Sequence, residues 1–326
     1  SVLVVGGAGY IGSHVVRALQ ARGCATVVLD NLSAGHRQAV RGAPLIVADV
    51  ADAAVVRQTI EAHAVDAVMH FASFIQVGES VAQPGKYYDN NVARTIALLN
   101  TLAACGVRHF IFSSTAAIFG EPQADVIDER HPQRPINPYG RSKWLVEQLL
   151  PDYERAHGLR SVCLRYFNAA GAHPDASLGE AHDPETHLIP LAIGAALGQR
   201  GALSVFGQDF PTPDGTCIRD YIHVVDLAQA HILALDYLRQ GGASAQMNLG
   251  NGTGYSVMEV IAAVQAAANL PVPCQMAGRR AGDPARLVAS ADKARALLGW
   301  TPQYAQLSAI VSHALAWHRK YPAFWD

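Results

Sequence analysis

Val2-Leu3-Val4-Val5-Gly6-Gly7-Ala8-Gly9-Tyr10-Ile11-Gly12 is the stretch that decides the fold of this chain. Its four leading apolar residues predict a buried strand, and the periodic pattern over residues 10–22 predicts a helix directly after it. Gly6, Gly9 and Gly12 lie in the connection, where glycine permits a tight turn and a close approach of the backbone to a pyrophosphate. The N-terminus of the helix offers N–H donors and positive potential to the same anion. The stretch therefore predicts a dinucleotide site, against the alternative of an ordinary strand–helix turn.

An acidic residue closes the next predicted strand. Asp30 follows the strand at residues 26–29 and stands 18 positions after Gly12. A carboxylate in this place accepts hydrogen bonds from the adenosine ribose hydroxyls and repels a 2′-phosphate. No basic residue follows it, because the chain continues Asn31-Leu32-Ser33. The sequence therefore favours NAD over NADP.

Strands and helices alternate through the first half of the chain. We predict helices at 10–22, 52–63, 87–104 and 138–150, and strands at 2–5, 26–29, 45–48, 67–70, 109–112 and 161–164. The strands are short and apolar throughout, as in parallel sheets that are buried on both faces. The predicted fold class is α/β, with a Rossmann-type doubly wound parallel sheet and a smaller α/β C-terminal substrate domain.

The alternation breaks after Asn168. Residues 169–187 show no periodicity and are rich in Gly, Pro, Asp and His, which predicts a long irregular loop of the kind that is usually functional. We expect an NAD-binding domain at 1–168, to which a strand near 246–250 returns, and a smaller second domain at 169–326. Helices are expected in the second part near 188–199, 224–239, 256–268, 291–298 and 305–319.

Composition excludes several classes of protein. A length of 326 residues suggests about two compact units, and 50% hydrophobic with 16% charged residues excludes a disordered chain. A net charge of −2 argues against nucleic acid as a partner. No apolar run reaches the ~18 residues of a membrane span, and the chain opens on a strand instead of a signal peptide. Five scattered cysteines without a C-x-x-C pair fit a reducing cytoplasm, where we expect the protein to be.

The run Tyr139-Gly140-Arg141-Ser142-Lys143 follows Pro138 at a predicted helix start. Tyr139 and Lys143 are four residues apart and share one helical face. A buried ammonium, together with a positive nicotinamide ring, lowers the pKa of a phenol, so Tyr139 is expected to accept a proton from a sugar hydroxyl near neutral pH. The alternative for a Y-x-x-x-K pair is a solvated helix face. The strand at 109–112 ends in Ser113-Ser114-Thr115 beside the expected cofactor, which favours the chemical interpretation.

Together these motifs resemble the extended short-chain dehydrogenase/reductase superfamily. Longer strings narrow the resemblance to its UDP-glucose 4-epimerase family, and they extend over nearly the whole chain: Gly78-Glu79-Ser80, Tyr87-Tyr88-Asp89-Asn90-Asn91, Leu164-Arg165-Tyr166-Phe167-Asn168 and Arg219-Asp220-Tyr221-Ile222-His223-Val224. The resemblance implies reversible epimerisation at C4 of a UDP-hexose with bound NAD. Tyr139 would take the proton of O4 while hydride leaves C4, and the 4-keto sugar would then turn and be reduced on its other face. Lys143 would hold the nicotinamide ribose, and Thr115 would share the proton of the sugar hydroxyl.

The resemblance also assigns two sets of binding residues. The expected NAD contacts are Gly6, Gly9, Tyr10, Ile11, Gly12, Asp30, Asn31, Asp49 (to the adenine amino group), Val50, Phe71, Ala72, Asn90, Ser113, Tyr139, Lys143 and Phe167. The expected contacts of the nucleotide sugar are Thr115, Asn168, His187, Leu188, Ser204, Val205, Phe206, Arg219, Arg280, Asp283 and Leu287. Arginines suit a diphosphate because the guanidinium forks onto anionic oxygens. Phe206 is expected to cover uracil, and Asp283 to accept the ribose hydroxyls.

Two positions depart from the best-known form of the family. His187 stands where many relatives have Asn, and Leu287 stands where a Tyr or Cys lines the sugar pocket. Leucine leaves more volume near the sugar than tyrosine does. UDP-GlcNAc and UDP-GalNAc are therefore alternative substrates, and a UDP-pentose is a further alternative.

Other activities on the same fold are less well supported. Nucleotide-sugar 4,6-dehydratases carry an Asp-Glu pair directly after the threonine, and decarboxylases carry a Glu at the second of these positions. The chain has Ala116 and Ala117 there, which transfer no proton. A non-catalytic NAD-binding sensor would typically have lost the tyrosine or the lysine, and both are present.

The resemblance implies a homodimer, formed by the helices at 87–104 and 138–156 as a four-helix bundle. Leu145, Val146, Leu149 and Leu150 give part of an apolar stripe, which equally suits packing on the sheet. Pro151 is expected to kink or end the second helix. The histidines show no metal-ligand spacing, and no metal is expected.

Overall fold

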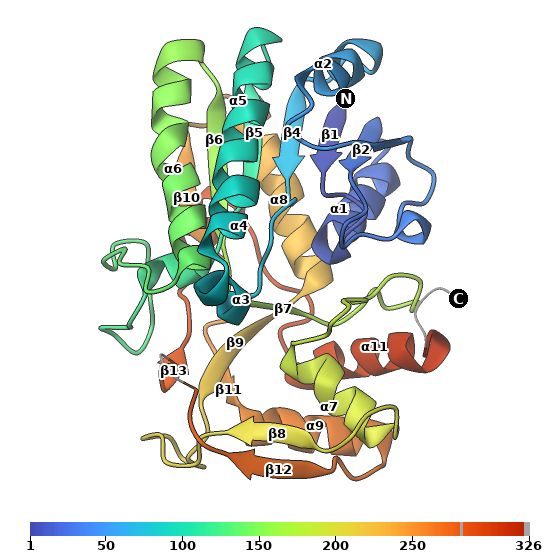
Figure 1. Ribbon diagram of the computed structural model, residues 1–326, viewed down its shortest axis with the longest axis vertical. Coiled ribbons are helices and arrows are strands. Elements are labelled where there is room, and N and C mark those ends of the chain that lie inside the picture. The colour runs from blue at the N-terminus through green and yellow to red at the C-terminus, as the bar shows by residue number, and fades with distance from the viewer. Residues whose placement is uncertain (281–282, 323–326) are drawn as a thin grey trace.

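The computed structural model of the chain describes residues 1–280 and 283–322. Its centre is a seven-stranded sheet in the order β10-β6-β5-β4-β1-β2-β3, in which every pairing is parallel (Figure 1). The strands are β1 (Val2–Val5), β2 (Thr26–Asp30), β3 (Leu45–Val47), β4 (Ala67–His70), β5 (His109–Ser113), β6 (Arg160–Arg165) and β10 (Ala245–Asn248). The strand expected near 246–250 corresponds to β10, which pairs with β6.

Helices cover both faces of this sheet. Side chains of one strand alternate between two cores: Val2 and Val4 join one, while Leu3 and Val5 join the other. In Figure 1, α5 and α6 lie in front of the sheet and α8 lies behind it. The helices that flank the sheet are α1 (Tyr10–Ala21), α2 (Ala53–Ala62), α5 (Arg94–Ala104), α6 (Pro138–His157) and α8 (Val224–Arg239). The arrangement confirms the predicted Rossmann-type doubly wound class.

A smaller group of elements lies below the large sheet in Figure 1. Its central strand β9 (Ile218–His223) pairs with β7 (Asn168–Ala170), β11 (Gly254–Ser256) and β13 (Arg286–Leu287), and β8 (Leu203–Phe206) pairs with β12 (Cys274–Ala277). A separate core there includes side chains of α7 (Leu188–Ala196), α9 (Val257–Ala268) and α11 (Leu307–Lys320). One further helix of the C-terminal part, α10 (Asp292–Leu298), contacts α8.

The segment at 87–104 is helical throughout, as predicted, but a wider turn divides it. It comprises α4 (Pro84–Tyr88), a π-helical turn at Asp89–Ala93 and α5, and α3 (Val77–Ala82) precedes them. Buried Asn91 explains the wider turn. Its amide oxygen accepts a hydrogen bond from Phe74 N at 2.9 Å, and its nitrogen donates to Phe74 O and to Ser142 Oγ at 3.0 Å each. These bonds attach the turn to α6.

The prediction for Pro151 is partly wrong, because α6 continues past it to His157. A proline costs a helix one amide donor, but its φ is helical, and Val146 and Leu150 anchor the preceding turn in the core against the sheet. The helix ends instead at Gly158, whose φ of +69° is the left-handed conformation favoured at this position. The other predicted boundaries agree with the structure to within three residues.

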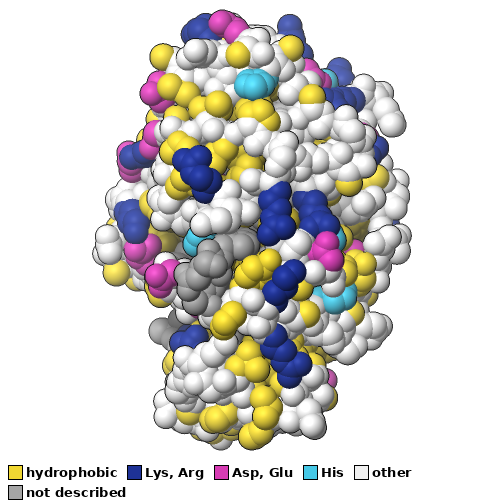
Figure 2. Space-filling view, turned by 90° about the vertical axis from the view of Figure 1, so that its right-hand side faces the viewer, with side chains coloured by type: hydrophobic (Ala, Val, Ile, Leu, Met, Phe, Trp, Pro, Cys, Tyr) yellow, Lys and Arg dark blue, Asp and Glu magenta, His cyan; other side chains and the backbone are white. Residues whose placement is uncertain are grey.

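Surface and helix properties fit the composition. On the face shown in Figure 2, basic side chains stand among acidic, apolar and uncharged ones. Among the helices of the described ranges, none has both the length and the apolarity that crossing a lipid bilayer requires.

We predict that Asn91→Ala lowers the free energy of unfolding by about 2–4 kcal/mol, because the part-buried N–H and C=O of Phe74 lose their shared partner and Ser142 Oγ loses a donor. Urea denaturation followed by circular dichroism measures this. Asn100→Ala is the matched control, since Asn100 is exposed on α5 and accepts a single side-chain hydrogen bond, from Tyr153. Equal losses in the two variants would contradict the role given to the Asn91 amide.

Candidate active site

The glycine loop between β1 and α1 is shaped for a ligand that approaches the backbone. A Cβ on Gly6, whose φ is +78°, would lie 2.5 Å from the amide nitrogen of Ala72, and a Cβ on Gly12 would lie 2.2 Å from the carbonyl oxygen of Gly6. Both positions therefore require glycine. Gly9 precedes α1 without a side-chain cap, so the first-turn amides stay available to an anion. The loop fits the pyrophosphate of NAD.

Asp30 holds this loop in place. Its Oδ2 accepts the amide of Ala8 at 2.9 Å, and its Oδ1 accepts the amide of Leu32 at 2.8 Å. Burial raises the pKa of the Asp30 carboxyl, and the two amide bonds oppose that shift. The carboxylate at the end of β2 thus fastens both the loop and the turn that follows β2.

The other residues expected to contact NAD lie mostly where a strand of the large sheet ends. In a parallel sheet the carboxyl ends of the strands meet at one edge, at the point where the strand order reverses. Tyr10 and Ile11 begin α1, Asn90 lies in the π-helical turn, and the rest close or directly follow a strand: Asn31, Asp49, Val50, Phe71, Ala72, Ser113 and Phe167. The sequence analysis missed Arg94, which forms an ion pair with Asp49.

Tyr139 and Lys143 occupy the first turns of α6. Asn137 caps this helix by accepting the amide of Gly140 at 2.8 Å. Lys143 is buried, and its Nζ donates to Ser73 Oγ at 2.7 Å and to the carbonyl of Ser113 at 2.8 Å. Thr115 directly follows the strand end at Ser113-Ser114, and its side chain lies close enough to the Tyr139 hydroxyl to lower the pKa of that phenol. The three expected catalytic side chains thus lie at the edge that also carries the glycine loop.

The expected lowering of the Tyr139 pKa is not found in the protein alone. Burial raises the pKa of Tyr139, while its bond to Thr115 opposes the shift. Burial also lowers the pKa of Lys143 to about 7, against the attraction of Glu147. The cost of desolvating each charge opposes the attraction between the two groups, and the lowering expected with the nicotinamide ring in place stays a prediction.

A buried ion pair supports this arrangement, and the sequence analysis missed it. Arg165 on β6 donates to both carboxylate oxygens of Glu147 on α6, and Ser114 Oγ donates to Oε1 at 2.5 Å. The side chains of Arg165 and Glu147 are 3% and 1% exposed. The pair fixes α6 to the strands one turn after Lys143.

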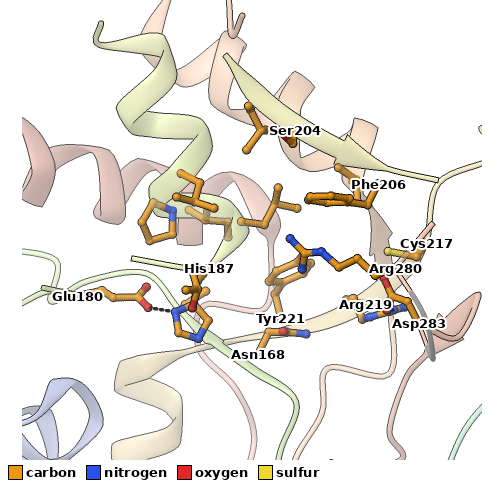
Figure 3. A pocket seen from close by; sticks show the side chains of 18 of the residues that line it. Asn168, Glu180, His187, Ser204, Phe206, Cys217, Arg219, Tyr221, Arg280 and Asp283 are labelled. Carbon is orange, nitrogen blue, oxygen red and sulfur yellow. Dashed lines mark hydrogen bonds and ion pairs between the residues drawn. The ribbon is translucent and has the colours of Figure 1, made fainter. Parts of the chain in front are cut away.

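A cavity of about 390 Å³ opens beside this edge, between α7, β8 and β9 (Figure 3). The guanidinium of Arg280 stacks on the ring of Phe206 at 3.9 Å. Arg219 forms an ion pair with Asp283, and the amide of Asn168 donates to the carbonyl of Asp220 at 3.0 Å. Eight expected substrate residues line the cavity: Asn168, His187, Leu188, Ser204, Phe206, Arg219, Arg280 and Asp283.

Three expected substrate residues do not line the cavity. Val205 is fully buried in the core of the smaller group of elements. Leu287 packs in a small cluster that contains Phe119, Trp144 and Phe167. Thr115 lies at the edge with Tyr139. Lining residues that the sequence analysis missed include Glu180, Cys217 and Tyr221.

Contrary to the prediction, two histidines of the described residues do lie at metal-ligand spacing, together with two glutamates. Glu180, His182, Glu185 and His187 converge within 4.8 Å. The signal was present in the sequence as E-x-H-x-x-E-x-H over 180–187, inside the segment that we predicted as a long, functional loop without naming its ligands. Burial disfavours a charged imidazole, but the two glutamates outweigh it and raise the pKa of His187 to about 10 and that of His182 to about 9.

Comparisons with known proteins agree with the site. Residues 2–250 match the NAD dependent epimerase/dehydratase family. The chain is 53% identical over 320 residues to a UDP-glucose 4-epimerase of Rhizobium leguminosarum bv. trifolii, which covers 98% of each chain. Its fold is similar to that of the Brucella ovis UDP-glucose 4-epimerase solved in complex with NAD (TM-score 0.95, 49% identity, 99% and 98% of the chains covered).

A further solved structure with this fold is the UDP-Glc/GlcNAc 4-epimerase of Campylobacter jejuni, with a TM-score of 0.85 and 44% identity over 98% of this chain and 99% of that one. The family match covers well over half of the chain, and the identities are high over nearly its full length. The chain therefore belongs to the NAD dependent epimerase/dehydratase family and, within it, to the UDP-glucose 4-epimerases.

Proposed function

We propose that the chain interconverts UDP-glucose and UDP-galactose, with Tyr139 as the group that moves the proton. The observation that carries this proposal is the placement of Tyr139, Thr115 and the buried, hydrogen-bonded Lys143 at the sheet edge that bears the glycine loop, with a cavity containing two arginines beside it. Ala116 and Ala117 follow Thr115, so no carboxylate stands there to expel water from an oxidised sugar. The oxidised sugar is then reduced again, which is the outcome of an epimerase.

Tyr139 accepts the proton of the sugar O4 through its phenol oxygen and returns it after the sugar has turned. Thr115 orients the phenol and the O4 hydroxyl by hydrogen bonding to both. Lys143 is held by Ser73 and the Ser113 carbonyl, and its ammonium stabilises the phenolate when the proton moves. Bound NAD supplies the acceptor and donor of the C4 hydride.

The cavity residues hold the nucleotide while the sugar turns. Arg219 and Arg280 bind the diphosphate, and the Phe206 ring beneath Arg280 offers a face for uracil. Asp283 accepts ribose hydroxyls and, with Arg219, keeps the charge of the wall balanced. Anchoring at the nucleotide leaves the hexose free to present either face of C4 to the same tyrosine.

The two parts of the chain divide these tasks. We propose that residues 1–168, together with β10, bind NAD, and that residues 169–326 mainly bind the nucleotide sugar. The expected NAD contacts all belong to the first part, while the cavity lining belongs to the second apart from Asn168. A cytoplasmic location is part of the proposal, since all five cysteines are free thiols. Recovery of the activity outside the cytoplasmic fraction would contradict it.

We predict that Tyr139→Phe lowers kcat about 10²–10⁴-fold, because the proton of O4 loses its acceptor. NAD content, measured on denatured protein, should stay unchanged. Conversion of UDP-galactose without added NAD is the assay. Tyr153→Phe on the same helix is the control, since that hydroxyl only reaches exposed Asn100. Turnover of Tyr139→Phe near that of the control would remove Tyr139 from the mechanism.

A second substrate class is favoured by Leu287. This side chain packs beside Phe167, an expected NAD contact, and beside Ala116, which follows Thr115. We propose that its small size admits the N-acetyl group of UDP-GlcNAc or UDP-GalNAc. Leu287→Tyr should then lower turnover of UDP-GlcNAc about ten- to hundredfold and change turnover of UDP-glucose little. The exposed Leu297→Tyr serves as control, and equal UDP-GlcNAc rates for wild type and Leu287→Tyr would refute the idea.

We also propose a homodimer through α5 and α6. Val146 and Leu150 face the sheet, but Ile96, Leu145 and Leu149 remain only half-buried and can meet a second copy. Leu149→Glu should convert a dimer into a monomer in sedimentation equilibrium, because it places a charge in the apolar bundle. The control is Leu270→Glu, at an exposed leucine far along the chain. A wild type that sediments as a monomer would contradict the proposal.

A further inference from the structure

Four side chains at the end of the irregular segment 171–187 present their metal-binding atoms to one another. Glu180, His182, Glu185 and His187 each contribute one such atom, and all four atoms lie within 4.8 Å. The proton transfer proposed above uses none of them. Glu180 and His187 line the cavity wall, as Figure 3 shows, so the cluster lies directly behind the substrate pocket.

The distances within the cluster suit a tetrahedral ion. His187 Nδ1 lies 2.8 Å from Glu180 Oε1 and 3.0 Å from Glu185 Oε1. His182 Nδ1 lies 3.0 Å from Glu180 Oε1 and 3.8 Å from Glu185 Oε2. Ligands bound to zinc at about 2.0–2.2 Å stand roughly 3.3–3.5 Å apart at the corners of a tetrahedron. Small side-chain rotations would bring the four groups onto one ion.

Glu185 supplies an independent sign of a missing partner. Its Oε1 accepts the backbone amides of Thr186 at 2.7 Å and His187 at 2.8 Å. Its Oε2 is buried and has no hydrogen-bond partner within the described part of the chain. A buried carboxylate oxygen without a donor is costly, and a cation bound at Oε2 would remove that cost.

The charges of the cluster match a dication. Two carboxylates balance one divalent cation when both imidazoles are neutral. They equally balance two protons, one on each imidazole. One dication can therefore replace the two protons, one on each imidazole, without changing the buried net charge. The displaced protons are released to solvent.

We propose that Glu180, His182, Glu185 and His187 form a structural site for one zinc-type divalent cation. Two nitrogen ligands favour a borderline metal such as zinc over magnesium or calcium, which take oxygen ligands. All four ligands come from the protein, which is typical of structural zinc. The ion fastens the irregular segment to α7, whose N-cap is His187, and to Tyr10 of the glycine loop, whose ring meets His182 edge-on at 6.0 Å.

The test begins with the full-length, NAD-loaded protein. It is stripped with a chelator, gel-filtered, and incubated with ZnCl₂ or, separately, with MgCl₂. Mass spectrometry of the desalted protein should find about one zinc per chain and no retained magnesium. Zinc at about a hundredfold excess over its Kd should raise Tm by about 3–8 °C. A wild type that retains no zinc overturns the proposal.

Matched variants locate the ion. His182→Gln and Glu185→Gln should each weaken zinc binding by at least about tenfold, whereas His182→Cys keeps a zinc ligand and should keep the ion. His173→Gln is the control, because His173 lies in the same segment and pairs with Asp175 instead. Unchanged zinc retention in both Gln variants, or equal loss in the control, would contradict the assignment. Metal content does not depend on epimerase turnover, so this result stands apart from the proposed function.

Discussion

Glu147 is a buried carboxylate on α6 that receives hydrogen bonds from Ser114 and from the guanidinium of Arg165. These partners come from the ends of β5 and β6, the two strands beneath the helix. Breaking one member of such a pair leaves an uncompensated buried charge, so the position of α6 on the sheet is strongly determined. Tyr139 and Lys143 precede Glu147 on the same helix, and Thr115 follows Ser114. This ion pair therefore acts with the bonds of Lys143 to Ser73 and Ser113 to set the relative placement of the three catalytic candidates.

Burial at the same edge also determines what the catalytic groups can do. The protein alone raises the pKa of Tyr139 and lowers that of Lys143 to about 7, so burial opposes charge on both groups. A cationic nicotinamide ring supplies positive charge beside the phenol when NAD is bound. In the proposed mechanism, proton removal would therefore depend on the bound cofactor, which would tie the acid–base step to the hydride step.

The fold brings the cavity lined by α7, β8 and β9 next to this edge. Strand β7 begins at Asn168, shortly after β6 ends, and pairs with β9, from which Arg219 reaches Asp283. The irregular segment 171–187 connects β7 to α7 across the glycine loop, where Tyr10 donates to the carbonyl of Gly171 at 2.6 Å. The segment therefore contacts both Tyr10, next to the glycine loop, and the residues that line the cavity.

The sequence by itself determined the features that depend on neighbouring residues: the glycine loop, Asp30 at the end of the second strand, the Y-x-x-x-K pair and the strand–helix alternation. Local patterns are readable because they need only backbone conformation and periodicity. Tertiary structure decided the π-helical turn at Asn91, the pairs of Glu147 with Arg165 and of Asp49 with Arg94, and the inward burial of Val205. Each of these joins elements distant in the chain or depends on which face packs inward. It also decided the pKa of Tyr139, because desolvation depends on everything that surrounds a group and not on its neighbours in sequence.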